Sequence, residues 1–110
     1  MRYKARTDAN QQAVIDMLRQ VGASVQSLAA IGNGCPDLLV GYNGRTFLME
    51  VKDGAKTASQ IRLTPDQVEW HQKWVGGSLS IVYGPEGALE VIGAFKHART
   101  QAIVQANKAV

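Results

Sequence analysis

The sequence predicts an α/β fold in which a mixed five-stranded sheet is flanked by helices, in the order α-β-β-β-α-β-β-α. Two apolar runs flank Asn43-Gly44, a pair that favours the tight turn of a β-hairpin because both turn residues need positive φ. Helix-start patterns precede and follow this hairpin. With 110 residues, 45% of them hydrophobic, the chain fits a single domain, residues 1–110, with one modest core.

The first helix and the first strand precede the hairpin. Residues 9–21 are predicted to be helical because apolar residues recur at helical spacing until Gly22 ends the pattern. Residues 24–28 alternate weakly, which indicates a short strand. The two strands of the hairpin are predicted over residues 36–42 and 45–52.

A helix follows the hairpin after a loop. Residues 53–63 contain turn formers and charges without periodicity, so they are predicted to be a loop. Thr64 to Gln67 combine an N-cap, a first-turn proline and a capping box, which predicts a helix that runs to Gly76-Gly77. The remaining predicted elements are a strand over 78–84, a turn at 85–87, a strand over 88–92 and a helix over 94–108.

Composition argues against several classes of protein. No apolar run approaches the ~20 residues that span a bilayer, and the basic start of the chain lacks the apolar stretch of a signal peptide. We therefore expect a cytoplasmic protein without membrane contact. The single cysteine, Cys35, excludes an internal disulfide and is expected to be a small buried residue, not a nucleophile. His71 and His97 lack ligand spacing, so a zinc hydrolase is not expected.

The charge of the chain suits a polyanionic partner without requiring one. The net charge is +3 and the isoelectric point is near 9.2. Basic residues gather at the N-terminus, where Lys4 and Arg6 lie, and in the loop after the hairpin, where Lys56 and Arg62 lie. On charge alone, contact with phosphates and simple exposure to solvent are equally good interpretations of these two clusters.

Two carboxylates are predicted to meet at the end of the hairpin. If Asn43 and Gly44 form the turn, Asp37 falls across from Glu50, and Lys52 lies on the same face as Glu50. Opposed carboxylates repel each other and raise a carboxylate pKa unless a cation lies between them. Lys52 could be that counter-ion, but we favour Mg²⁺ held by Asp37 and Glu50, with Lys52 beside it. The opposite face carries an ordinary core set, Leu38, Val40, Phe47, Met49 and Val51.

These residues carry a resemblance to a known family. Pro36-Asp37 followed by Glu50-Val51-Lys52 resembles the motif of the PD-(D/E)XK nuclease superfamily. The wider stretches GCPDLLVGYNGRTFLMEVKDG and LTPDQVEWHQKW resemble more narrowly the small VRR-NUC and Holliday-junction-resolvase-like nucleases, including stand-alone phage versions. The resemblance covers residues 8–92, and its specificity comes from the combination of both motifs on one hairpin with the helix that follows.

The resemblance implies a restriction-endonuclease-like core that hydrolyses DNA phosphodiester bonds with Mg²⁺ or Mn²⁺, with a preference for branched or junction DNA. It implies that Asp37 and Glu50 bind the metal together with the Val51 carbonyl, that Lys52 is the catalytic lysine, and that Gln67 joins the catalytic set. It also suits a homodimer in the cytoplasm of a bacterium or a phage-infected cell. The proposed DNA-backbone contacts are Lys4, Arg6, Lys56 and Arg62.

Two glutamines bear on the make-up of the predicted metal site. From spacing alone Gln67 closes a capping box with Thr64, and we expect that one orientation of its side chain does not serve both the cap and the site. Gln11 stands on the first helix where related nucleases often carry a metal-reaching glutamate. It should face inward as a neighbour of the metal site, but an amide is a weaker ligand than a carboxylate, which argues against a second metal.

A second class of function stays open beside the nuclease. It is a catalytically silent nucleic-acid-binding or assembly module that keeps the fold and the basic face, although the intact set of Asp37, Glu50 and Lys52 argues against it. Trp70 and Trp74 lie one helical turn apart, and for them we expect core or interface contacts rather than base stacking.

Overall fold

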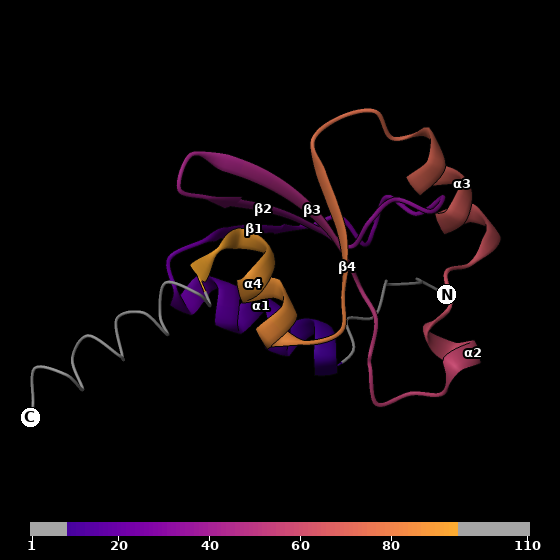
Figure 1. Ribbon diagram of the computed structural model, residues 1–110, viewed down its shortest axis with the longest axis horizontal. Coiled ribbons are helices and arrows are strands. Elements are labelled where there is room, and N and C mark those ends of the chain that lie inside the picture. The colour runs from indigo at the N-terminus through magenta and orange to yellow at the C-terminus, as the bar shows by residue number, and fades with distance from the viewer. Residues whose placement is uncertain (1–8, 95–110) are drawn as a thin grey trace, which may run out of the picture.

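The computed structural model describes residues 9–94 as a four-stranded mixed sheet with helices around it (Figure 1). The strands lie in the order β1-β2-β3-β4, antiparallel from β1 to β3 and parallel between β3 and β4. The predicted mixed sheet is therefore confirmed. The elements are α1 (Ala9–Gln20), β1 (Ser24–Ser27), β2 (Leu38–Tyr42), β3 (Arg45–Val51), α2 (Ala58–Ile61), α3 (Pro65–Lys73), β4 (Ser78–Val82) and α4 (Pro85–Ile92).

The β2–β3 hairpin has the predicted turn and register. Asn43 and Gly44 take positive φ values of 53° and 77°, as a type I′ turn requires. Tyr42 pairs with Arg45 at the turn, and Leu38 pairs with Met49 at the far end. This register sends the alternate side chains of both strands to the face predicted to be the core.

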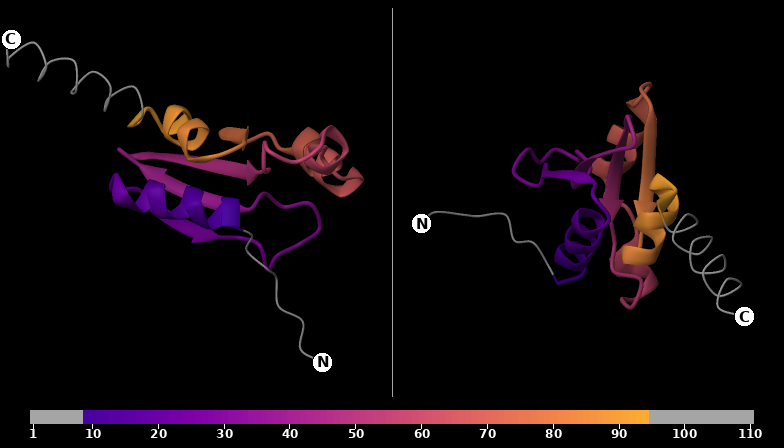
Figure 2. Two further views of the ribbon diagram at one scale, coloured as in Figure 1. Left: turned by 90° about the horizontal axis from the view of Figure 1, so that it is seen from below. Right: turned by 90° about the vertical axis from the view of Figure 1, so that its left-hand side faces the viewer.

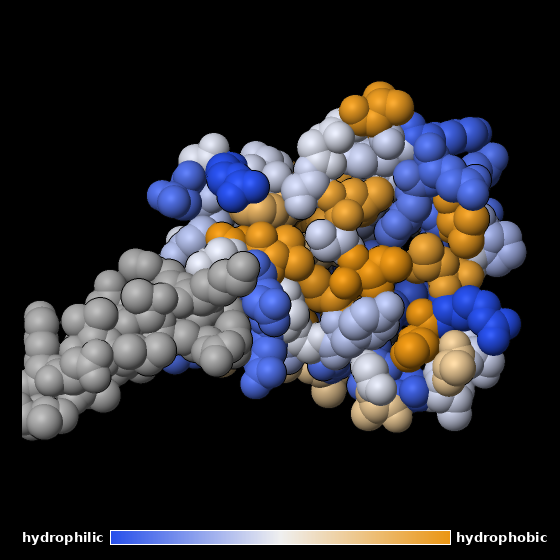
Figure 3. All heavy atoms as spheres, in the orientation of Figure 1, coloured by the Kyte–Doolittle hydropathy of each residue, from blue (hydrophilic) through white to orange (hydrophobic). Residues whose placement is uncertain are grey.

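The core lies between one face of the sheet and two helices. Figures 1 and 2 show α1 and α4 side by side against this face. Figure 3 shows a band of hydrophobic side chains across the middle of the visible face, while the core side chains themselves lie inside. Each such side chain contributes ~1.5–3 kcal/mol when it is fully buried. The buried set includes Val14, Ile15 and Leu18 of α1, Leu38, Val40, Phe47, Met49 and Val51 of the hairpin, Val82 of β4, and Ala88, Leu89 and Ile92 of α4.

The predicted fifth strand is wrong, because residues 88–92 belong to α4. The run ALEVI is short and apolar, so its periodicity does not separate a strand from a helix. Pro85 starts the helix at its first turn, and Gly93, with φ of 85°, ends it. The buried side chains at 88, 89 and 92 follow helical spacing.

The connection between β3 and β4 contains both α2 and α3. Residues 53–63, predicted to be a loop, contain the single helical turn α2, whose capping box is formed by Thr57 before the turn and Gln60 within it. α3 begins after Thr64 as predicted but ends at Lys73, where the Trp74 N–H contacts the His71 carbonyl instead of continuing the helix. Figure 1 shows α3 at the end of the sheet, away from α1 and α4. No residue of α3 is buried.

The loop before β2 approaches the first turn of α3 very closely. Gly34 has a φ of 84°, and a Cβ added there would collide with the carbonyl of Asp66. Glycine is therefore required both for the backbone conformation and for the contact. This contact sets the start of α3 beside the start of β2.

Some predictions fall outside the described part of the chain. These are the helix over 94–108 and the proposed contacts Lys4 and Arg6. Within residues 9–94, no helix has the length and apolar character needed to cross a membrane.

Candidate functional site

Asp37 and Glu50 meet where β2 begins and β3 ends. Asp37 directly precedes Leu38, whose partner in the hairpin is Met49, so Asp37 lies beside Glu50. The Asp37 side chain accepts a hydrogen bond at Oδ2 from the Val51 N–H at 2.8 Å. Its backbone carbonyl accepts one from the Leu28 N–H at 2.7 Å. Asp37 is therefore fixed from both neighbouring segments of backbone.

Glu50 is a buried carboxyl group with a strongly raised pKa. Its residue is 2% exposed. Burial is the largest cause that raises its pKa to about 8, followed by a hydrogen bond to Asp37 and the negative charge of Asp37, while Lys52 lowers it. A hydrogen bond between two carboxyls needs a proton on one of them. Near neutral pH, and without a cation, the protonated form of Glu50 is therefore favoured.

Gln67 joins the carboxyl pair to the lysine. Its Nε2 donates to Glu50 Oε2 at 3.0 Å, and its Oε1 accepts from Lys52 Nζ at 2.9 Å. Lys52 Nζ itself lies 3.9 Å from Glu50 Oε2, and the side chains of Lys52 and Glu50 are 13% and 3% exposed. The three polar groups thus form a closed, mostly buried network on one face of the sheet.

The same Gln67 side chain also caps α3. Its Oε1 accepts the Thr64 N–H at 2.9 Å, and its own backbone N–H donates to Thr64 Oγ1 at 3.2 Å. The prediction that one orientation does not serve both the cap and the site is wrong. An amide oxygen accepts two hydrogen bonds while the amide nitrogen donates on the other side, so a single rotamer satisfies both roles.

The oxygen atoms at this site fit a hard divalent cation that keeps several of its water ligands. Within residues 9–94, no group of three or more His, Cys, Asp or Glu side chains is arranged to hold a metal ion. The protein ligands would be Asp37, Glu50 and the Val51 carbonyl, which is an all-oxygen set of the kind that Mg²⁺ accepts beside water. In the same range no donor contacts Glu50 Oε1, although this oxygen is buried. A cation is a natural partner for such an oxygen.

The start of α1 contacts the site in a way that the sequence did not indicate. Gln11 is buried in the first turn of α1, as predicted from its spacing. Its neighbour Asn10 donates from Nδ2 to the Lys52 carbonyl at 3.1 Å and to the Tyr83 carbonyl at 3.2 Å. These bonds tie the first helix to the ends of β3 and β4. The two bonded residues are separated from Asn10 by 42 and 73 positions in the sequence, and no local pattern reveals contacts over such separations.

Two further polar side chains surround the site. Burial, followed by the charges of Glu50 and Asp37, raises the pKa of the Cys35 thiol, which keeps it protonated and disfavours a nucleophilic role. Burial, followed by the positive charge of Lys52, lowers the pKa of His71 on α3. The neutral form of the His71 ring is therefore favoured.

The proposed backbone contacts lie on both sides of α2. Lys56 precedes this helical turn and Arg62 follows it, and both side chains are exposed. They stand in the segment that leaves the site after Lys52.

Comparison with known proteins supports the fold. No family model and no curated protein matches the sequence. A solved structure described as a "VRR_NUC domain" is similar to the chain, with a TM-score of 0.56 and 24% sequence identity over 77% of this chain and 91% of that one. The chain has the VRR-NUC fold. In this VRR-NUC fold Pro36-Asp37 and Glu50-x-Lys52 lie on one hairpin, as the resemblance implied.

Proposed function

We propose that this protein is a Mg²⁺-dependent DNA endonuclease that hydrolyses phosphodiester bonds. The observation that carries the proposal is the half-buried Asp37 beside the buried Glu50, with Lys52 and Gln67 hydrogen-bonded into the same network on a VRR-NUC fold. Mn²⁺ has the same preference for oxygen ligands and is expected to replace Mg²⁺.

The charged groups of the site suit phosphoryl chemistry. Asp37, Glu50 and the Val51 carbonyl would hold the cation, which when bound would supply positive charge to polarise the scissile phosphate. Lys52, fixed by Gln67 Oε1 at 2.9 Å, is proposed to orient the attacking water or to stabilise the negative charge that develops on the phosphate. Water attacks phosphorus in line, a new P–O bond forms, and the P–O bond to the leaving sugar oxygen breaks, while the attacking water gives up a proton and the leaving oxygen takes one up.

The proposed substrate is branched or junction DNA. The exposed Lys56 and Arg62, with Lys4 and Arg6 near the N-terminus, would contact phosphates, which provide affinity but little sequence information. A homodimer would present two such sites to a junction. The proposed nuclease would cut DNA in the cytoplasm of a bacterium or a phage-infected cell.

A catalytically silent nucleic-acid-binding or assembly module is the second candidate. The observation that favours this candidate is that, within the described residues, the site contains two carboxylates and not three. Gln11 stands on α1 where the family resemblance would place a third carboxylate. Such a protein would bind DNA without cutting it.

A cleavage assay separates the two candidates. Labelled duplex, single-stranded and four-way-junction DNA are incubated with the protein in Mg²⁺, Mn²⁺ or chelator. Lys52→Ala and Asp37→Ala should each reduce the cleavage rate by roughly 10²–10³-fold. Asp16→Ala is the matched control, because Asp16 is exposed on α1, where its side chain accepts a hydrogen bond from Gln12. If no DNA is cut with either metal, or if the site variants cut as fast as the parent, the nuclease proposal fails.

A further inference from the structure

Two tryptophans form a braced aromatic pair on the surface of α3. The rings of Trp70 and Trp74 are stacked, with centroids 5.1 Å apart and planes inclined by 15°. Trp74 is 39% exposed, and neither side chain belongs to the core, so of the expected core or interface contacts the core contacts are not made, and an interface stays a prediction. Trp74 Nε1 donates to the Gly77 carbonyl at 2.9 Å, and a Cβ at Gly76 would collide with the Trp74 ring. The pair is therefore held in place before any ligand arrives.

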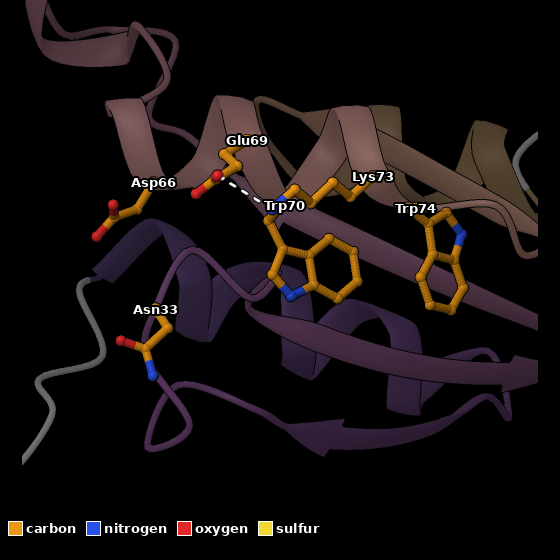
Figure 4. Close-up of a pocket in the computed structure, with 6 residues that line it drawn as sticks. All are labelled: Asn33, Asp66, Glu69, Trp70, Lys73 and Trp74. Carbon is orange, nitrogen blue, oxygen red and sulfur yellow. Dashed lines mark hydrogen bonds and ion pairs between the residues drawn. The ribbon is translucent and has the colours of Figure 1, made fainter.

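A small open cavity lies beside this pair (Figure 4). Its volume is about 280 Å³, slightly below the ~300–1,000 Å³ of cavities that hold drug-sized ligands. Figure 4 shows Trp70 between Trp74 on one side and the side of the pocket formed by Asp66 and Asn33 on the other. This volume suits one planar group placed against the Trp70 ring. The lining residues are Asn33, Asp66, Glu69, Trp70, Lys73 and Trp74.

The aromatic pair continues the candidate active site along α3. Gln67 and Trp70 lie three positions apart on α3, so they share one side of the helix, and Trp74 follows at its C-terminal end. His71 lies edge-on against Trp70, with centroids 6.4 Å apart and an interplanar angle of 72°. Along the helix axis Trp70 is ~4.5 Å from Gln67. Neighbouring phosphates of one DNA strand are ~3.4 Å apart along a duplex, so the pocket lies within a few nucleotides of the site.

We infer that this pocket binds an unpaired base of the DNA strand that the site acts on, stacked against Trp70. The inference rests on the proposed function and gives it a structural basis for those branched substrates that carry unpaired bases near the branch. Aromatic side chains bind bases of single strands in this way because every base has a flat π-face. The pair is already ordered, so little conformational entropy is lost on binding.

The polar rim of the pocket favours a base over the sugar-phosphate backbone. Asp66 and Glu69 are exposed carboxylates that repel phosphates. They are also hydrogen-bond acceptors for the exocyclic amino groups of cytosine, adenine and guanine, which thymine lacks. Lys73 lies 3.1 Å from Glu69 and offsets part of its charge. The pocket is therefore expected to prefer cytosine to thymine.

Intrinsic fluorescence tests the inference directly, because the chain contains two tryptophans and both line the pocket. The full chain is titrated in chelator, so that no cleavage occurs, with oligo(dC), oligo(dT) and an abasic strand of the same length. Oligo(dC) should quench the fluorescence saturably, oligo(dT) more weakly, and the abasic strand not at all. Equal quenching by the abasic strand, or no quenching by any strand, overturns the inference. A fluorescence change on raising the protein concentration without DNA also overturns it, because a second copy would then cover the pair.

Variants at Trp70 provide the second arm. Trp70→Leu keeps an apolar residue on a helix with no buried side chain, so the protein should still fold, which circular dichroism checks. Its affinity for labelled oligo(dC), measured by fluorescence anisotropy, should fall roughly 5- to 150-fold. Trp70→Phe should retain most of the affinity, and Asp66→Asn with Glu69→Gln should narrow the preference for oligo(dC). Equal affinity of Trp70→Leu and the parent would overturn the inference.

The binding and cleavage assays fail independently of each other. A protein that binds oligo(dC) at Trp70 but cuts no DNA would retain the base pocket and refute the nuclease proposal. A protein that cuts DNA in Mg²⁺ without a tryptophan response in chelator would retain the nuclease and refute the pocket.

Discussion

The Gln67 amide donates a hydrogen bond to Glu50 at 3.0 Å, and this single contact couples helix α3 to the end of strand β3. The carbonyl oxygen of the same side chain accepts from the Thr64 N–H and from Lys52 Nζ. The cap of α3 and the charged network are therefore one unit. A change that moves the start of α3 also moves a partner of Glu50 and Lys52.

Replacement of Gln67 should separate its two roles when it is compared with replacement of its capping partner. Gln67→Leu should lower the unfolding free energy by roughly 0.5–2 kcal/mol through loss of the cap and should also reduce DNA cleavage by at least roughly tenfold. Thr64→Ala should cost similar stability but retain most of the cleavage rate. Urea denaturation and a cleavage assay on the same preparations measure both effects. If Thr64→Ala loses as much cleavage activity as Gln67→Leu, the loss in Gln67→Leu does not come from its contacts with Glu50 and Lys52.

The raised pKa of Glu50 predicts a stability that falls with rising pH in chelator. The pKa of this carboxyl rises from its ordinary value of 4.5 to about 8 on folding. Between these values the folded protein binds more protons than the unfolded chain, so the unfolding free energy decreases as pH increases, by a few kcal/mol in all. Above pH 8 this contribution is lost in full. Thermal melts from pH 5 to 9 should show the slope, and Glu50→Gln should remove it; an unchanged slope in Glu50→Gln would assign it to another group.

Mg²⁺ should stabilise the folded protein at pH 8. A ligand that binds only the folded state adds about 2.7 kcal/mol when its concentration is 100 times its dissociation constant. For a chain of this size each kcal/mol raises Tm by roughly 4–8 °C. The increase in Tm should vanish in Asp37→Asn and in Glu50→Gln. It should persist in Asp16→Asn, because Asp16 is an exposed residue of α1 and not part of the Asp37–Glu50 pair. Equal melting curves of the parent in Mg²⁺ and in chelator would contradict metal binding at this pair.

Gly34 should be far less tolerant of substitution than Gly32, although both have positive φ. A Cβ at Gly34 would collide with the Asp66 carbonyl, whereas a Cβ at Gly32 would meet nothing within 4 Å. Gly32→Ala should cost roughly 1 kcal/mol of unfolding free energy from backbone conformation alone. Gly34→Ala should cost more and should also reduce cleavage, because α3 must shift away from the site. Urea titrations of both variants measure the difference, and similar costs at the two positions would show that the close approach is unimportant.

The hairpin was predictable from the sequence because its chemistry is local. Asn43-Gly44 accept the positive φ values of the turn, and alternation then places Asp37 and Glu50 on one face. Residues 88–92 were misassigned because a five-residue apolar run satisfies both strand and helix periodicity. The contacts of Asn10 were missed because they depend on how distant segments meet.

The lack of buried residues in α3 has a consequence for how this protein changes over time. The core is built by the sheet with α1 and α4, so substitutions on the outer side of α3 cost little folding stability. Natural variation can therefore sample new surfaces on this helix while Thr64 and Gln67 keep its first turn in register. The β3–β4 connection is the segment whose surface can diverge among descendants of this chain without a matching loss of the fold.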